Sequence, residues 1–150
     1  MRIALYQPDI PQNSGNIFRL GACFGISIDI IEPTGYIFDD KRFRRSSMDY
    51  INHIDYKRHI DWENFINWSK KNNFRLILLT TKAEKKYCDY TYKNNDILLF
   101  GRESAGVPKK VHNNVDEQIT IPMVKGLRSI NVSSAVALVV GEACRQLNLF

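Results

Sequence analysis

Three polar clusters in this sequence contain the residue types that could do chemistry. The first is NSGNIFR over 13–19, in which the candidate side chains are Asn13, Asn16 and Arg19. Apolar spacing predicts a helix over 15–25, and the N-terminus of a helix attracts anions. These side chains are therefore candidates to bind a phosphate or to polarise a hydroxyl group. The alternative is a capped helix start that carries a surface arginine.

The second cluster is FGRESAGVP over 100–108, which directly follows a predicted strand. Gly101 permits a close approach of the backbone to a ligand, and Glu103 stands between glycines as a hydrogen-bond acceptor. The alternative is an ordinary turn between a strand and a helix, where glycine is also common.

The third cluster is IPMVKGLRSINVSS over 121–134, which joins a strand to the last predicted helix. It is polar only toward its end, and serine and asparagine ahead of an apolar helix are ordinary capping residues. All three clusters nevertheless follow strands of what we expect to be one sheet. Ligands of α/β proteins bind at the carboxyl ends of the strands, so the clusters together predict a binding site.

Short apolar runs predict the strands that must position these clusters, over 2–6, 27–32, 75–80, 96–100 and 117–121. Apolar residues at helical spacing predict helices over 15–25, 61–72 and 131–149, with Ser14 and Asn131 or Ser133 as candidate N-caps. A charged, helix-like segment covers 39–47. The alternation indicates an α/β fold, with a mostly parallel sheet and helices on both faces. We expect a single domain over 1–150.

Several function classes are excluded by motif and composition. No G-x-G-x-x-G follows the first strand, and Val107 and Pro108 stand where a P-loop would have its lysine and hydroxyl. Three cysteines without a C-x-x-C pair and three histidines without H-E-x-x-H spacing give no support for a metal site. No apolar run approaches the ~20 residues of a membrane span, so we expect a soluble, cytoplasmic protein.

Basic residues exceed acidic ones by 21 to 16, for a net charge of +5. Scattered lysines fit a solvated surface, so clustered arginines are the better indication of a binding face. Such a cluster lies at helical spacing within 41–45 and would form one phosphate-binding face: Lys41, Arg42, Arg44 and Arg45. A solvated charged helix is the alternative.

Taken together, NSGNIFR, FGRESAGVP and IPMVKGLRSINVSSAVALVVGEA resemble, in order, the three motifs of the SPOUT superfamily of knotted RNA methyltransferases. The segment IEPTGYIFDDKRFRRSSMDY over 31–50 is similar to the TrmL group. That group comprises tRNA (cytidine(34)-2′-O)-methyltransferases, which methylate the wobble ribose of certain leucine tRNAs, on cytidine or a modified uridine. Gly141 departs from the group, which usually has tyrosine there.

The resemblance implies a deep trefoil knot near the C-terminus, S-adenosylmethionine bound bent within it, S-adenosylhomocysteine as product, no metal, a homodimer, and tRNA as the partner. Matching the motifs carries over cofactor-contacting positions to Leu79, Gly101, Ile121 and Ser129. It also carries over the positions around the reacting ribose to Asn13, Arg19, Glu103, Ser129 and Asn131.

Arg19 is the resembled family's candidate general base. Because arginine stays protonated in proteins, positioning a phosphate and polarising the hydroxyl are equally expected roles. Two further hypotheses stay open from the sequence. One is ribose methylation at another tRNA or ribosomal RNA site, and the other is an RNA-binding SPOUT protein without catalysis.

Overall fold

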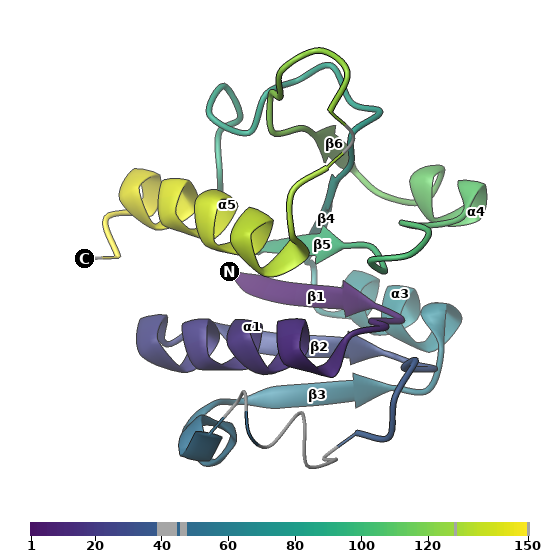
Figure 1. Ribbon diagram of the computed structural model, residues 1–150, viewed down its shortest axis with the longest axis vertical. Coiled ribbons are helices and arrows are strands. Elements are labelled where there is room, and N and C mark those ends of the chain that lie inside the picture. The colour runs from purple at the N-terminus through teal and green to yellow at the C-terminus, as the bar shows by residue number, and fades with distance from the viewer. Residues whose placement is uncertain (39–44, 46–47, 128, 150) are drawn as a thin grey trace.

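The computed structural model describes residues 1–38, 45, 48–127 and 129–149, and these build a six-stranded sheet between helices (Figure 1). The strands run in the order β3-β2-β1-β5-β4-β6, and every pair is parallel. The fold class predicted from the sequence is confirmed. The bounds are β1 Arg2–Tyr6, β2 Ser27–Ile31, β3 Tyr56–His59, β4 Arg75–Leu79, β5 Asp96–Phe100 and β6 Glu117–Ile119.

Alternate side chains of the strands point into two separate cores, one on each face of the sheet. On β1, Ile3 and Leu5 belong to one core, whereas Ala4 and Tyr6 belong to the other. This follows from the period of two along a strand. Because both faces are covered, the central strands are mostly apolar, and all five residues of β5 are buried.

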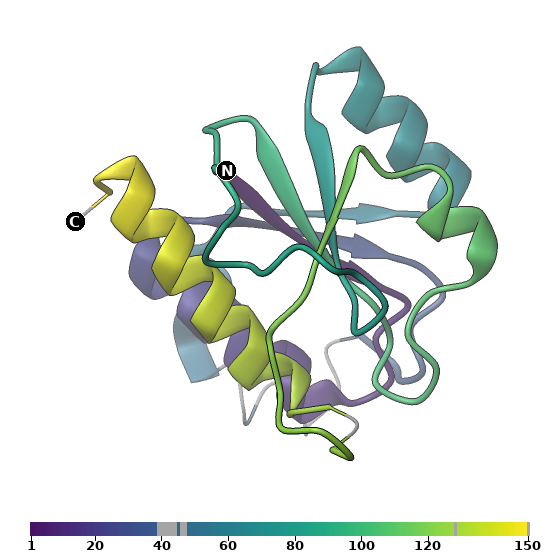
Figure 2. The same cartoon turned by 90° about the horizontal axis from the view of Figure 1, so that it is seen from above.

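The helices divide between the two faces, as Figure 2 shows from above. α1 (Pro11–Phe24) and α5 (Val132–Leu147) lie side by side on one face, next to the short η1 (Met48–His53). α3 (Trp62–Lys71) and α4 (Lys109–His112) cover the other face. Among the described residues, none of the helices is long and apolar enough to cross a membrane.

The start of α1 differs from the sequence expectation. The helix begins at Pro11 with Ile10 as N-cap, so Ser14 is its fourth residue and not its cap. A proline has the helical φ and no N–H, which suits the first helical position. The other predicted cap is confirmed, because Asn131 Oδ1 accepts hydrogen bonds from the backbone N–H of Ser133 and Ser134 at 2.8 and 3.3 Å.

Strand β3 was not predicted, because its sequence YKRH is polar. It lies at the edge of the sheet, where three of its four residues are exposed and only His59 is buried. Polar and charged side chains are usual on edge strands, since they discourage pairing with other chains. The predicted helix-like segment 39–47 lies outside the described residues, except for Arg45.

Two long connections meet beyond the carboxyl ends of β4 and β6. The backbone N–H of Thr80 donates to Ile119 O at 2.9 Å, and that of Tyr87 donates to Thr120 O at 2.8 Å. In return, the Thr120 N–H donates to Lys85 O at 2.8 Å. Figure 2 shows these connections crossing in front of the sheet. The arrangement is consistent with the trefoil knot that the resemblance implies, and the knot stays a prediction.

Candidate active site at the carboxyl edge of the sheet

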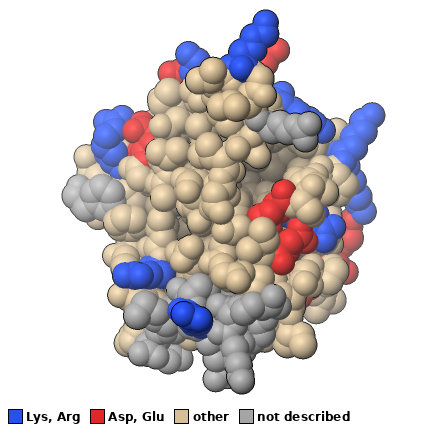
Figure 3. All heavy atoms as spheres, in the orientation of Figure 1, with Lys and Arg blue, Asp and Glu red and all other residues tan. Residues whose placement is uncertain are grey.

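A cavity of about 570 Å³ opens at the carboxyl ends of β1, β4, β5 and β6. Its walls come from the loops that follow these strands and from the first turns of α1 and α5. The strand order reverses here, because β1 lies between β2 and β5, and such reversals are where α/β sheets bind ligands. Figure 3 shows the hollow on this face of the molecule, with acidic side chains beside it.

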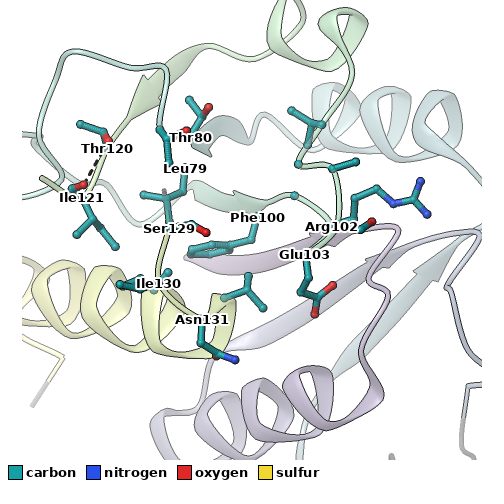
Figure 4. Close-up of a pocket in the computed structure, with 18 of the residues that line it drawn as sticks. Leu79, Thr80, Phe100, Arg102, Glu103, Thr120, Ile121, Ser129, Ile130 and Asn131 are labelled. Atoms are coloured by element: carbon teal, nitrogen blue, oxygen red, sulfur yellow. Dashed lines mark hydrogen bonds between the residues drawn. The ribbon is translucent and has the colours of Figure 1, made fainter. Parts of the chain in front are cut away.

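The cavity has an apolar side and a polar end (Figure 4). Leu79, Ile121 and Ile130 line one side, while Glu103 reaches in from the opposite loop. All four positions that the resemblance carried over for the cofactor line this cavity: Leu79, Gly101, Ile121 and Ser129. Three segments distant in the sequence therefore contribute to one small-molecule-sized space, as the position of the clusters after strands led us to expect.

Gly101 is required by its own loop, and this corrects the reason expected from the sequence. A Cβ on Gly101 would lie 2.7 Å from the carbonyl carbon of Gly106, so the space that we expected for a ligand is occupied by backbone. The loop is closed by two backbone hydrogen bonds between Arg102 and Gly106, of 3.1 and 2.8 Å. Gly106 itself has φ +66°, a left-handed conformation that favours glycine.

The polar end of the cavity is a chain of hydrogen bonds across three segments. Asn13 Nδ2 donates to Glu103 Oε1 at 3.0 Å, and Asn131 Nδ2 donates to Asn13 Oδ1 at 2.9 Å. We call these three residues the amide relay. Asn13 is 6% exposed, so its amide depends on these partners. The first turn of α1, the loop after β5 and the N-cap of α5 thus meet at one point.

Two predicted ribose-site residues lie outside the relay: Ser129, which lines the cavity, and Arg19. Arg19 is exposed on α1, and its guanidinium carbon lies 5.4 Å from the centre of the Tyr50 ring, a cation–π contact with η1. It is not among the described residues that line the cavity. Its role toward RNA stays a prediction.

The proposed basic face is tested only slightly by the structure. Lys41, Arg42 and Arg44 lie outside the described residues, and Arg45 is exposed. Within the described part of the chain, no group of three or more His, Cys, Asp or Glu side chains is placed to hold a metal ion.

The cavity is also lined by polar residues that do not belong to the three sequence clusters. Thr80 and Lys82 follow β4, and His112 comes from α4. The predicted strand over 75–80 gave a signal for the first two, since residues at the carboxyl end of a central parallel strand belong to this edge. His112 gave none, because its helix has only four residues.

Comparison with known proteins agrees with this architecture. Residues 1–141 match the model of the SpoU rRNA Methylase family. A tRNA (cytidine(34)-2′-O)-methyltransferase from Beijerinckia indica subsp. indica is 49% identical over 145 residues, which are 97% of this chain and 91% of that protein.

Two solved structures share the fold and part of the sequence. One, described as giving insights into the 2-OH methylation of C/U34 on tRNA, has a TM-score of 0.93 at 33% identity, covering 98% of this chain and 95% of that one. The AdoMet-bound rRNA methyltransferase from Sinorhizobium meliloti has a TM-score of 0.89 at 26% identity, covering 97% of this chain and 56% of that one. The family match spans the sheet, the cavity loops and most of α5. This chain therefore belongs to the SpoU rRNA methylase family.

Proposed function

We propose that this protein is a tRNA (cytidine(34)-2′-O)-methyltransferase that uses S-adenosylmethionine. The observation that carries the proposal is the meeting of three sequence clusters at one cavity, where an apolar side faces the amide relay. The name and 49% identity of the Beijerinckia relative support the reaction and the target nucleotide. Leucine tRNAs, with cytidine or a modified uridine at position 34, are the substrates that the sequence resemblance favours.

The residues around the cavity fit the proposed cofactor. Its volume of about 570 Å³ lies within the ~300–1,000 Å³ that small-molecule sites occupy. Leu79 and Ile121 would pack on the adenine ring, and backbone groups near Gly101 and Ser129 would bind its polar atoms. When bound, S-adenosylmethionine supplies an electrophilic methyl group on a positively charged sulfur. The AdoMet-bound relative from Sinorhizobium supports this choice of cofactor.

The chain's own contribution to methyl transfer would be positioning. The reaction would need the ribose 2′-hydroxyl held in line with the methyl group that the cofactor supplies, and a proton acceptor beside that hydroxyl. Holding the reacting groups in line can supply up to ~7–11 kcal/mol of the barrier reduction. Glu103 and Asn131 stand at the polar end of the cavity, where the relay would orient the ribose. Arg19, which stays charged, would hold an RNA phosphate or polarise the hydroxyl.

We propose that the protein acts as a homodimer through the face formed by α1 and α5. On α5, Leu138 is 45% exposed, and Gly141 follows it at helical spacing. Outside the helix's own nearby backbone, no described atom lies within 4 Å of a Cβ added to Gly141. Arg19 is exposed on the neighbouring α1. A second protomer on this face would bring both cavities near one interface, and the tRNA would contact both subunits. Because tRNA is the substrate, we place the reaction in the cytoplasm.

A pair of matched tRNAs tests the reaction. An unmodified leucine tRNA with cytidine at position 34 should accept a methyl group from labelled S-adenosylmethionine. The same tRNA carrying 2′-deoxycytidine at that position should accept none, because the reacting hydroxyl is missing. Equal labelling of the two tRNAs would place the target at another nucleotide. Calorimetry that detects no S-adenosylmethionine binding would instead favour an RNA-binding protein without catalysis.

A further inference from the structure

The loop 101–106 brings Gly101 and Glu103 to the cavity, yet its own backbone bonds join only its two ends. The paired hydrogen bonds between Arg102 and Gly106 close the turn without attaching it to the rest of the protein. The loop therefore depends on side-chain contacts for its position over the cavity.

Asp9, in the loop after β1, supplies such contacts from more than ninety residues away in the sequence. Its Oδ1 accepts a hydrogen bond from Arg102 Nη2 at 3.1 Å. Its Oδ2 accepts from the backbone N–H of Ser104 at 3.1 Å and from the Ser104 hydroxyl. Glu103, between these two residues, accepts from the backbone N–H of Asp9 at 2.8 Å. Three consecutive residues of the turn are thus bound to the single residue Asp9.

Asp9 is itself fixed by a third loop. The backbone N–H of Gly35, after β2, donates to Pro8 O at 2.9 Å. A Cβ on Gly35 would lie 3.0 Å from Asp9 Cα and 3.1 Å from Asp9 Oδ1, so this loop packs closely against Asp9. The Asp9 side chain is 21% exposed, and Asp9 is not among the described residues that line the cavity. Its side-chain contacts are therefore with the neighbouring loops and not with the cavity.

The charge of Asp9 suits this role. Partial burial alone would raise the pKa of Asp9, but hydrogen bonds from Ser104 and the positive charge of Arg102 outweigh it and hold that pKa below its ordinary value. The carboxylate is therefore ionised from about pH 5 upward. Both oxygens of the Asp9 side chain receive hydrogen-bond donors, from Arg102 on one side and from Ser104 on the other. An ionised carboxylate accepts at both oxygens, whereas an asparagine amide has only one oxygen and would turn its NH2 group toward one of these donors.

We propose that Asp9 is a positioning residue, which sets the 101–106 loop so that Gly101 and Glu103 are placed to bind the cofactor and orient the ribose. This inference rests on the proposed function for what the loop binds. It extends the site to a residue in neither the cavity lining nor the amide relay.

Two variants of Asp9 and one matched control test the proposal. Asp9→Ala removes all its side-chain contacts. Asp9→Asn keeps the size but turns an NH2 group toward either Arg102 or Ser104. Asp61→Ala is the control, because Asp61 also accepts a backbone N–H, from Asn64 at 2.7 Å, as the N-cap of α3. Losing that cap costs about 1 kcal/mol of stability without touching the cavity.

Calorimetry with S-adenosylmethionine, at a temperature where all the proteins are folded, gives the first measurement. We expect about tenfold weaker binding for Asp9→Asn, since losing a hydrogen bond to a charged group typically changes an equilibrium by this much or more. Asp61→Ala should bind like the wild type. The Asn variant should show the same deficit from about pH 5 to 8, because the wild-type carboxylate is ionised throughout. Wild-type affinity in Asp9→Asn would overturn the proposal.

Hydrogen exchange of the backbone amides in 101–106, without cofactor, gives the second measurement. Exchange there should accelerate in Asp9→Ala and Asp9→Asn and stay unchanged in Asp61→Ala. If Asp9→Ala does not fold, Asp9→Asn decides alone. Unchanged exchange in the Asn variant would show that Asp9 does not hold the loop. A wild-type protein that binds no S-adenosylmethionine would overturn the proposed function instead, and the exchange comparison would still decide the role of Asp9.

Discussion

Replacing Glu103 with glutamine should destabilise the site, because both neighbours of this carboxylate are hydrogen-bond donors. Oε1 accepts from Asn13 Nδ2 at 3.0 Å, and Oε2 accepts from the backbone N–H of Asp9 at 2.8 Å. A glutamine amide has one oxygen and one NH2 group, so its NH2 must face one of these donors. The substitution hardly changes the volume of the side chain, so it tests pairing and charge without a change of packing.

Rotating the other amides does not repair the mismatch. If Asn13 turned its oxygen toward the new glutamine, its NH2 group would face Asn131 Nδ2, which donates to it at 2.9 Å in the wild type. Asn131 would then have to turn as well and withdraw the oxygen that accepts from the N–H groups of Ser133 and Ser134. One donor stays without an acceptor wherever the mismatch is moved.

The expected cost follows from the burial of these groups. An unsatisfied buried polar group costs ~1–3 kcal/mol, and we expect about 1–2 kcal/mol here because Glu103 is only half-buried. For a chain of this size each kcal/mol lowers the melting temperature by roughly 2–4 °C, so Glu103→Gln should melt roughly 2–8 °C lower.

Thermal and urea denaturation of Glu103→Gln and of Glu63→Gln check this value. Glu63 is exposed on α3 and pairs with Lys110, so the control removes the same charge from a surface ion pair, which contributes little to stability. A wild-type midpoint in Glu103→Gln would refute the reasoning about two donors. An equal loss of stability in Glu103→Gln and Glu63→Gln would mean that only the removed charge matters.

Further predictions address the loop, the arginine and α5. Gly101→Ala should weaken S-adenosylmethionine binding and lower the melting temperature, because the added Cβ would lie 2.7 Å from the carbonyl carbon of Gly106. A folded variant with unchanged affinity in calorimetry would contradict this. Arg19→Ala should keep cofactor affinity and abolish methyl transfer to tRNA. Arg19→Lys keeps the positive charge but loses the planar guanidinium, so it tests which of the two the reaction needs. A wild-type transfer rate in the alanine variant would show that Arg19 takes no part in the reaction. Within one protomer, Gly141→Ala should stabilise α5 by up to about 1 kcal/mol, since glycine is costly inside a helix and, outside the helix's own nearby backbone, no described atom lies within 4 Å of the new Cβ. A gain in the free energy of unfolding by urea denaturation would mean that the proposed dimer leaves position 141 open, and a loss would mean that the partner protomer packs directly on it. Hydrogen bonds from Arg145 and from a glutamine one turn away lower the pKa of Glu142 to about 2. Its stabilising effect is therefore present above about pH 4.5 and lost as the pH falls toward 2, and Glu142→Gln should remove this part of the acid dependence; identical pH profiles of stability for the two proteins would contradict it.

The central strands could be predicted from the sequence because burial on both faces makes them mostly apolar runs. β5 is the clearest example, since all of Asp96–Phe100 is buried. The same reasoning missed β3, whose edge position needs few apolar residues. It also placed the start of α1 too late, at residue 15, although Pro11 is the first residue of the helix.

For the site, the sequence could predict which loops meet but not which side chains touch. The clusters follow strands, and parallel strands end at one edge, so their meeting was predictable. The contact between Asn13 and Glu103 joins residues 90 positions apart and depends on the strand order, which periodicity does not reveal. The separation of Arg19 from the relay follows from the start of α1 at Pro11, which places Asn13 inside the same helix as Arg19. Both Asn13 and Arg19 belong to α1, and six residues at 3.6 per turn place their side chains about 120° apart around it.

Asn131 links two interpretations that the sequence left as alternatives, a helix cap and a ribose-site residue. As the cap of α5, its oxygen must face the N–H groups of the first turn, so its NH2 group must point away from the helix. That NH2 group meets the oxygen of Asn13, which therefore turns its own NH2 group toward residue 103. Residue 103 also meets the N–H of Asp9, so it receives two donors and has to be an acceptor at both ends. A carboxylate satisfies this condition, and the need for glutamate at 103 thus follows from the way α5 is capped.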